Sequence, residues 1–107
     1  MSSEEIREYA LSKDEADESF TFGEDTLVFK VKGKIFLLLS LSSTPTQFNV
    51  KCDPEKALEL REQYVCVKPG YHMNKKHWNT VIMDGTLPKG MIFEMIGHSY
   101  TLVSGRK

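Results

Sequence analysis

The sequence has little of what marks a secreted, membrane or disulfide-bonded protein. It holds only two cysteines, Cys52 and Cys66, in 107 residues, too few for a disulfide framework. Its longest apolar run, residues 35–41, is broken by Ser40 and is too short to cross a membrane. The first residues lack the basic start of a signal peptide. These absences predict a cytoplasmic protein with free thiols and no membrane partner.

Recognisable catalytic and metal-binding motifs are also absent. There is no Gly-rich phosphate loop, no nucleophile elbow and no zinc-protease helix. Cys66, His72 and His77 match no standard zinc spacing, and a fourth ligand would have to be Cys52 or His98. A Cys66–His72 pair lacks the surrounding signature of a cysteine enzyme. We therefore expect no enzyme, no catalytic residue, no metal and no cofactor.

Net charge is small, at −1, but the charges are unevenly placed along the chain. Residues 1–25 hold nine acidic residues against Arg7 and Lys13. Residues 26–52 hold four lysines and residues 63–83 hold three, and neither segment contains an acid. Near-neutrality overall argues against a dedicated high-affinity binder of nucleic acid, which is normally basic. The segregation of charge is the one electrostatic signal in the sequence.

Three helices are predicted, one at each end and one in the middle. A capping box that starts at Ser2 begins a helix over residues 3–11. Asp53 at the N-cap position, with proline after it, begins a second helix that ends near Tyr64. Pro88 precedes a third helix with a continuous apolar stripe. Arg61 lies near the apolar side of the second helix, where it either binds an anion or packs its stem over the core.

Strands are predicted where apolar residues alternate or run together, over residues 27–32, 35–41, 47–52 and 75–83. A short strand is also expected at residues 20–22, after an acidic loop over residues 13–19. Gly33-Lys34 is expected to form a type II′ hairpin turn. Short connections predict antiparallel pairing. Residues 1–107 are thus predicted to form one two-layer α+β domain, a mainly antiparallel sheet with its helices on one face.

The most specific local signal is the run PGYHMNKKHWNTV over residues 69–81. Four other segments accompany it: Phe22-Gly23, Lys34-Ile35-Phe36, Lys51-Cys52-Asp53-Pro54 and His98-Ser99-Tyr100. Together they closely resemble the MmcQ/YjbR-like family of small bacterial proteins, over nearly the whole chain. The resemblance implies a fold similar to CyaY-like, secretion-chaperone-like α+β domains. It also implies DNA binding, which has been inferred for the family from a double-wing arrangement of strands and helices.

Two departures from the family lower the positive charge of this chain. The segment after the first helix, residues 12–19, is more acidic than the short Pro-Gly turn usual there. The sequence ends at Arg106-Lys107, where relatives often carry a longer basic tail.

The candidate nucleic-acid site combines residues 69–81, which we call the family run, with lysines on the polar faces of predicted strands. Lysines would contact phosphates, Asn74 and Asn79 would form hydrogen bonds, and Tyr71 or Trp78 would stack on bases. If the strands are neighbours, Asn49 and the strand lysines form one basic sheet face. The candidate residues are Lys30, Lys32, Lys51, Tyr71, His72, Asn74, Lys75, Lys76, His77 and Trp78.

Other interpretations of the same residues stay open. Trp78 in the core and solvated lysines would give the same pattern without a function. A protein-interaction module, chaperone-like or adaptor-like, is the main alternative, with Met73, Met91 and Met95 as an adaptable surface. A third possibility is a small-molecule or anion site in a pocket on the loop at residues 72–77. DNA or another protein is therefore the expected partner, and the oligomeric state is not predicted.

Overall fold

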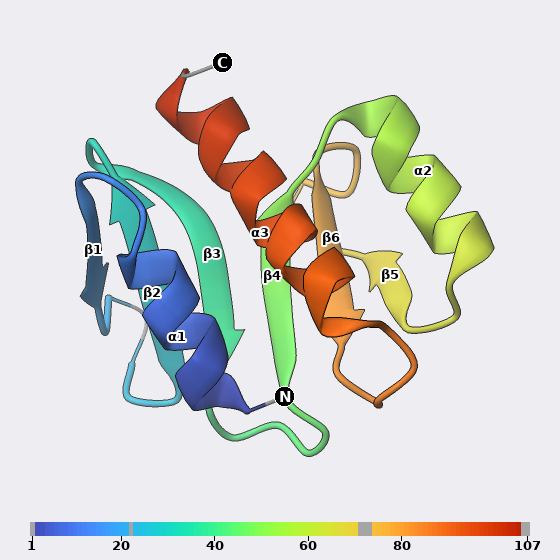
Figure 1. The fold of residues 1–107 in the computed structure, drawn as a ribbon, viewed down its shortest axis with the longest axis horizontal. Helices are drawn as coiled ribbons and strands as arrows, with labels where there is room; N and C mark the ends of the chain where they lie inside the picture. Colours follow the sequence, from blue (N-terminus) through green and yellow to red (C-terminus); the bar gives the residue numbers. More distant parts are fainter. Residues whose placement is uncertain (1, 22, 71–73, 106–107) are drawn as a thin grey trace.

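The computed structural model describes residues 2–21, 23–70 and 74–105 (Figure 1). In chain order the elements are α1 (Ser3–Leu11), β1 (Ala16–Ser19), β2 (Thr26–Val31), β3 (Lys34–Ser40), β4 (Gln47–Lys51), α2 (Pro54–Gln63), β5 (Val67–Pro69), β6 (Trp78–Ile82) and α3 (Lys89–Ser104).

The six strands form one sheet in the order β1-β2-β3-β4-β6-β5, and every neighbouring pair is antiparallel. The first four strands follow one another as a meander. β6 then inserts between β4 and β5, so that β5 forms the far edge. The β4–β6 pairing therefore joins the two halves of the sheet.

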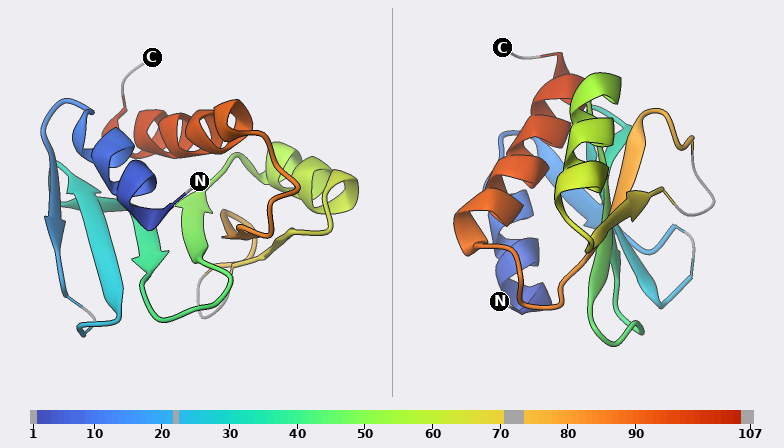
Figure 2. Two further views of the ribbon diagram at one scale, coloured as in Figure 1. Left: turned by 60° about the horizontal axis from the view of Figure 1, so that its bottom comes forward. Right: turned by 90° about the vertical axis from the view of Figure 1, so that its right-hand side faces the viewer.

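All three helices lie on the same face of the sheet (Figure 2). α3 crosses β3 and β4 at the centre, α1 packs beside α3 over β1, and α2 covers β5 and β6. The core between the layers is built on large side chains that are fully buried, among them Ile6, Phe29, Phe36, Phe48 and Ile96. The predicted two-layer α+β fold is confirmed.

Local sequence signals account for the helices. The capping box forms as expected, because the Ser2 side chain accepts from the Glu5 N–H and the Glu5 carboxylate accepts from the Ser2 N–H. Asp53 caps α2 by accepting from the Lys56 N–H. α3 continues through Gly97, which faces Tyr9 closely enough that a Cβ there would lie 3.4 Å from the Tyr9 hydroxyl.

The prediction at the start of the sheet is wrong by a few residues. Ala16–Ser19, predicted as a loop, is edge strand β1, whereas Phe20 lies just beyond it and Phe22 lies outside the described residues. The polar composition of this segment favours a loop when it is considered alone. Charged side chains on an edge strand protect it from pairing with other chains, so acidity is compatible with β structure there.

The turn between β2 and β3 also differs from its prediction. Its two central residues are Lys32 and Gly33, with φ of 52° and 79°, and Lys34 already belongs to β3. Two successive positive φ values correspond to a type I′ turn, not type II′. Lysine thus occupies a left-handed position where asparagine or glycine is usual.

Near the family run, the structure has one strand more than predicted. Val67–Pro69 forms β5, which is only three residues long and ends in proline, a residue that edge strands accept. The strand predicted over residues 75–83 is shorter, because residues 75–77 form a turn that leads into β6.

Candidate nucleic-acid interface

The face of the sheet opposite the helices carries an unbroken row of paired residues. Because side chains alternate along a strand, residues between the core positions point to this open face. One such row crosses all six strands in register: Ser19, Val28, Leu38, Asn49, Thr80 and Lys68. Within it the Thr80 hydroxyl donates a hydrogen bond to Asn49 Oδ1. The two central polar side chains thus satisfy each other.

Six of the sequence-predicted residues lie at one end of the sheet. β2 ends there, β3 begins, β4 ends and β6 begins, at the upper end in Figure 1. We call this set the lysine end; its members are Lys30, Lys32, Lys51, Lys75, Lys76 and Trp78. Lys30 and Lys51 are half-buried, as is Trp78, which pairs with Lys51 across β4 and β6. The other three lysines are exposed.

Acidic residues are absent from five of the six strands. Strands β2 to β6 contain four lysines and no acidic residue: Lys30, Lys34, Lys51 and Lys68. The helices contain four basic residues and seven acidic residues, the latter being Glu4, Glu5, Glu8, Glu55, Glu59, Glu62 and Glu94. Asp17 of β1 is the acidic side chain nearest in register, directly across from Lys30 at the sheet edge.

Asn74 shapes the turn that presents Lys75 and Lys76. Its Oδ1 accepts from the Lys76 N–H at 2.9 Å, and its carbonyl accepts from the N–H groups of His77 (3.2 Å) and Trp78 (3.0 Å). The carbonyl of half-buried His77 accepts from the Cys52 N–H at 2.7 Å. Asn74 and His77 are thus used in holding the turn against the rest of the fold.

Arg61 ties this turn to α2, which the sequence did not predict. Its Nε donates to Asn79 Oδ1 at 2.7 Å, and its Nη2 donates to the carbonyl oxygens of Lys75 and Trp78, the latter at 3.2 Å. Asn79 also donates to the Ala57 carbonyl at 3.4 Å and is only 1% exposed. The expectation that Asn79 contacts a ligand is therefore wrong, because its side chain points into the helix layer. An arginine near the apolar side of α2 was the available signal.

The other residues of the predicted sites either lie outside the described residues or are at least partly buried. Tyr71, His72 and Met73 lie outside the described residues. Met95 is buried in the core and Met91 packs against it half-buried, so neither forms the exposed methionine surface considered above.

The two cysteines do not form a disulfide. Cys52 and Cys66 are buried free thiols, and burial raises the pKa of Cys52 above its ordinary value. Within residues 2–21, 23–70 and 74–105, no three His, Cys, Asp or Glu side chains lie together as metal ligands would. Among these same residues, no helix has the length and apolar character needed to span a bilayer.

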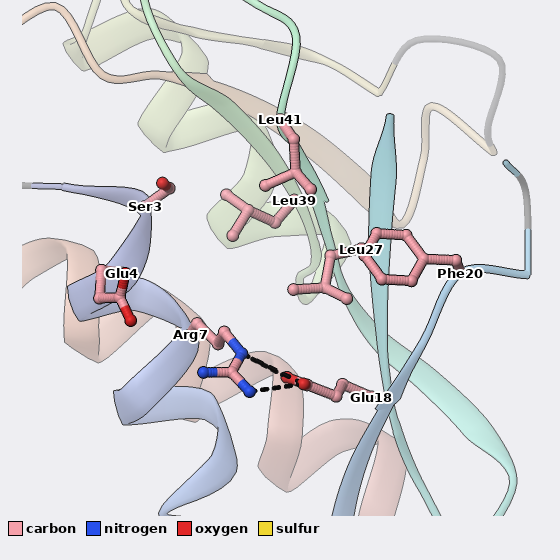
Figure 3. Close-up of a pocket in the computed structure, with 8 residues that line it drawn as sticks. All are labelled: Ser3, Glu4, Arg7, Glu18, Phe20, Leu27, Leu39 and Leu41. Atoms are coloured by element: carbon pink, nitrogen blue, oxygen red, sulfur yellow. Dashed lines mark hydrogen bonds and ion pairs between the residues drawn. The ribbon is translucent and has the colours of Figure 1, made fainter. Parts of the chain in front are cut away.

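A pocket of about 360 Å³ lies away from the lysine end, between α1 and the sheet (Figure 3). Its apolar lining comes from Phe20, Leu27, Leu39 and Leu41, and its polar lining from Ser3, Glu4, Arg7 and Glu18. Two other pockets, near Leu87 and near Leu60, measure only about 90 and 80 Å³. The lining residues of all three pockets exclude Lys75 and His77, so none of them is the site considered on that loop.

Comparison with known proteins gives a consistent family. The YjbR family model matches residues 11–102. The Escherichia coli O157:H7 protein YbdF is 42% identical over 77% of this chain and 67% of its own length, and the Escherichia coli K12 protein YjbR is 32% identical over 94% and 85%. Both bear names that describe them as uncharacterised. A Deinococcus radiodurans crystal structure with a DUF419 domain is 38% identical with a TM-score of 0.90, covering 94% of this chain and 77% of that one.

Proposed function

The chain belongs to the YjbR family, and from this premise we propose that it is a small cytoplasmic DNA-binding domain, not an enzyme, whose contact surface is the lysine end. The observation that carries the proposal is that strands β2 to β6 hold four lysines and no acid, while all acidic residues lie on the helices, on β1 and in the loops. A polyanion approaching the open face therefore meets lysines and neutral side chains, and no acidic side chain, on these strands.

The proposed binding is driven by phosphate charge and is largely independent of sequence. Lysine contacts a phosphate as a point charge and reads no base. At the centre of the open face the Thr80 hydroxyl is already engaged with Asn49 Oδ1. Half-buried Trp78 beside Lys51 is the aromatic side chain that would stack on an unpaired base.

The test is fluorescence anisotropy with labelled duplex and single-stranded DNA at low and physiological salt. Each neutralised phosphate releases counterions, so binding must weaken as salt rises. We expect Lys75→Glu/Lys76→Glu to weaken low-salt binding about tenfold or more and to reduce the salt slope by about two.

The matched control is Lys56→Glu/Lys89→Glu, which makes the same change in net charge on the helix layer. It is expected to change the affinity less than about threefold. No binding at low salt, or equal loss in both variants, would refute the proposal.

A further inference from the structure

The pocket beneath α1 has features of a binding site that the proposed function does not use. It lies at the end of the sheet opposite the lysine end, where β1 and β3 finish and β2 begins, and on the helix-covered face. Its floor is Leu27 and Leu39, both buried, and its walls are Phe20 and Leu41, which are 54% and 46% exposed. Exposed apolar side chains around a hollow are typical of sites where a partner's side chain is anchored.

The polar rim of the pocket is already paired on one side. The Arg7 guanidinium holds Glu18 with Nε to Oε2 at 2.8 Å and Nη2 to Oε1 at 2.7 Å, as the dashed lines in Figure 3 show. This carboxylate raises the pKa of Arg7. The charged side chains that line the pocket are Arg7, Glu18 and Glu4, so the lining carries one net negative charge.

The surroundings strengthen this negative character. Residues 1–25 carry nine acidic residues and two basic ones. Glu8 lies one turn after Glu4 on α1 and is also exposed. The Leu41 N–H donates to the Asp25 carbonyl at 2.7 Å, which holds another exposed acidic residue beside the pocket wall.

We propose that this pocket binds an apolar anchor side chain from a basic segment of another protein. Charge complementarity selects the occupant: an apolar group with lysine or arginine beside it satisfies both the floor and the rim. Nucleic acid and anionic lipid surfaces would be repelled by the same acids. A volume of about 360 Å³ is near the lower limit for small-molecule pockets and suits a single large side chain.

The first test separates the contributions of the apolar group and the charge with three small probes. Indole, tryptamine and indole-3-acetate share the bicyclic indole group and are respectively neutral, positively charged and negatively charged. Binding is followed through the methyl NMR signals of Leu27, Leu39 and Leu41. We expect tryptamine to bind more tightly than indole, and indole more tightly than indole-3-acetate. If indole-3-acetate binds as well as tryptamine, the acidic rim does not select the ligand and the proposal fails.

The second test uses three seven-residue peptides: one tryptophan between two pairs of lysines, the same peptide with alanine for tryptophan, and the same with glutamates for lysines. The first should bind about tenfold more tightly than either of the others, a difference of about 1.4 kcal/mol. Equal affinities for the three peptides would overturn the proposal of a protein partner. So would the absence of a saturable shift with any peptide, including the case in which the indole probes bind and the peptides do not.

Two variants test whether the peptide binds in this pocket. Leu41→Lys puts a positive charge in the pocket wall and should abolish peptide binding, whereas Leu58→Lys, at a 57% exposed position on α2, should leave it unchanged. Both positions are exposed, so both variants should fold, as their unperturbed core methyl signals would verify. If Leu41→Lys binds as well as Leu58→Lys, the pocket is not the site. None of these measurements involves DNA, so this proposal and the proposed function succeed or fail separately.

Discussion

Gly70 is fixed by a close approach between two strands. It is buried after the end of β5, and its N–H donates to the Trp78 carbonyl at 2.9 Å. A Cβ at this position would lie 2.8 Å from the Trp78 Cβ and 3.0 Å from its carbonyl oxygen. Neither neighbour is the flexible end of a side chain, so the backbone itself would have to move.

Gly70→Ala should therefore destabilise the protein by about 1–3 kcal/mol, the usual cost of overpacking. Urea denaturation measures the change. Gly90→Ala is the matched control, because a Cβ there meets nothing within 4 Å and alanine favours the helix. An unchanged urea midpoint for Gly70→Ala would show that the strands can separate freely.

Individual residues were predictable where their effect is local. Asp53 was predicted as a helix cap because capping involves the next few residues only. The inward direction of Asn79 was not predictable, since a polar residue is buried only when a partner is supplied, and Arg61 lies 18 positions earlier in the chain.

Among the elements, α2 and the turn before β6 act as one unit. Arg61 donates to two backbone carbonyls of residues 75 and 78 and to the Asn79 side chain. A planar guanidinium reaches several acceptors at once, and a lysine ammonium at the same place would not match them.

Arg61→Ala should cost about 1–3 kcal/mol by leaving the buried Asn79 oxygen unpaired, and Arg61→Lys should recover only part of it. Amide hydrogen exchange at His77 and Trp78 should accelerate in both variants. Arg7→Ala is the comparison, because solvent screens its partly exposed ion pair and leaves it little net effect on stability. If these amides exchange as slowly in the Arg61 variants as in the unmodified chain, the hydrogen bonds of Asn74 are sufficient to stabilise the turn.

Element prediction succeeded for long periodic segments and failed at the sheet edges. β3 and α3 carry enough apolar residues to be recognised alone. β1 and β5 have four and three residues, and each is a strand only because a neighbour pairs with it. Such edges depend on tertiary pairing rather than on local propensity.

At the scale of the whole molecule, His98 links stability to pH. Its Nε2 accepts from the Asp53 N–H at 3.3 Å, which joins α3 to the start of α2 and requires a neutral ring. Burial lowers the pKa of His98, and nearby Lys56 adds to the effect. The unfolded chain therefore takes up a proton at higher pH than the folded one, and stability falls as pH drops below the ordinary histidine value of about 6.5.

His98→Gln should remove this part of the pH dependence, because glutamine can accept the same hydrogen bond without titrating. Urea midpoints compared between about pH 7.5 and pH 5.5 should fall more for the unmodified protein than for the variant. Parallel declines would indicate that other groups control acid stability.

The acid-free strands β2 to β6 show what the sequence could and could not predict. Acid-free lysine segments were visible along the chain. Their meeting at one end of the sheet depends on β6 lying beside β4, a pairing between residues about 30 positions apart. No local pattern determines which strand lies there.

Because β6 pairs with β4, the sheet cannot be completed during synthesis until β6 has been made. β4 has a partner on only one side until residue 82 has emerged, and its buried residues Phe48 and Val50 lack the cover that α3 later provides. An unpaired strand edge is a template for wrong partners. The nascent first half is thus the aggregation-sensitive stage of this fold, and Lys51 at the end of β4 places a solubilising charge on that edge when it is most exposed.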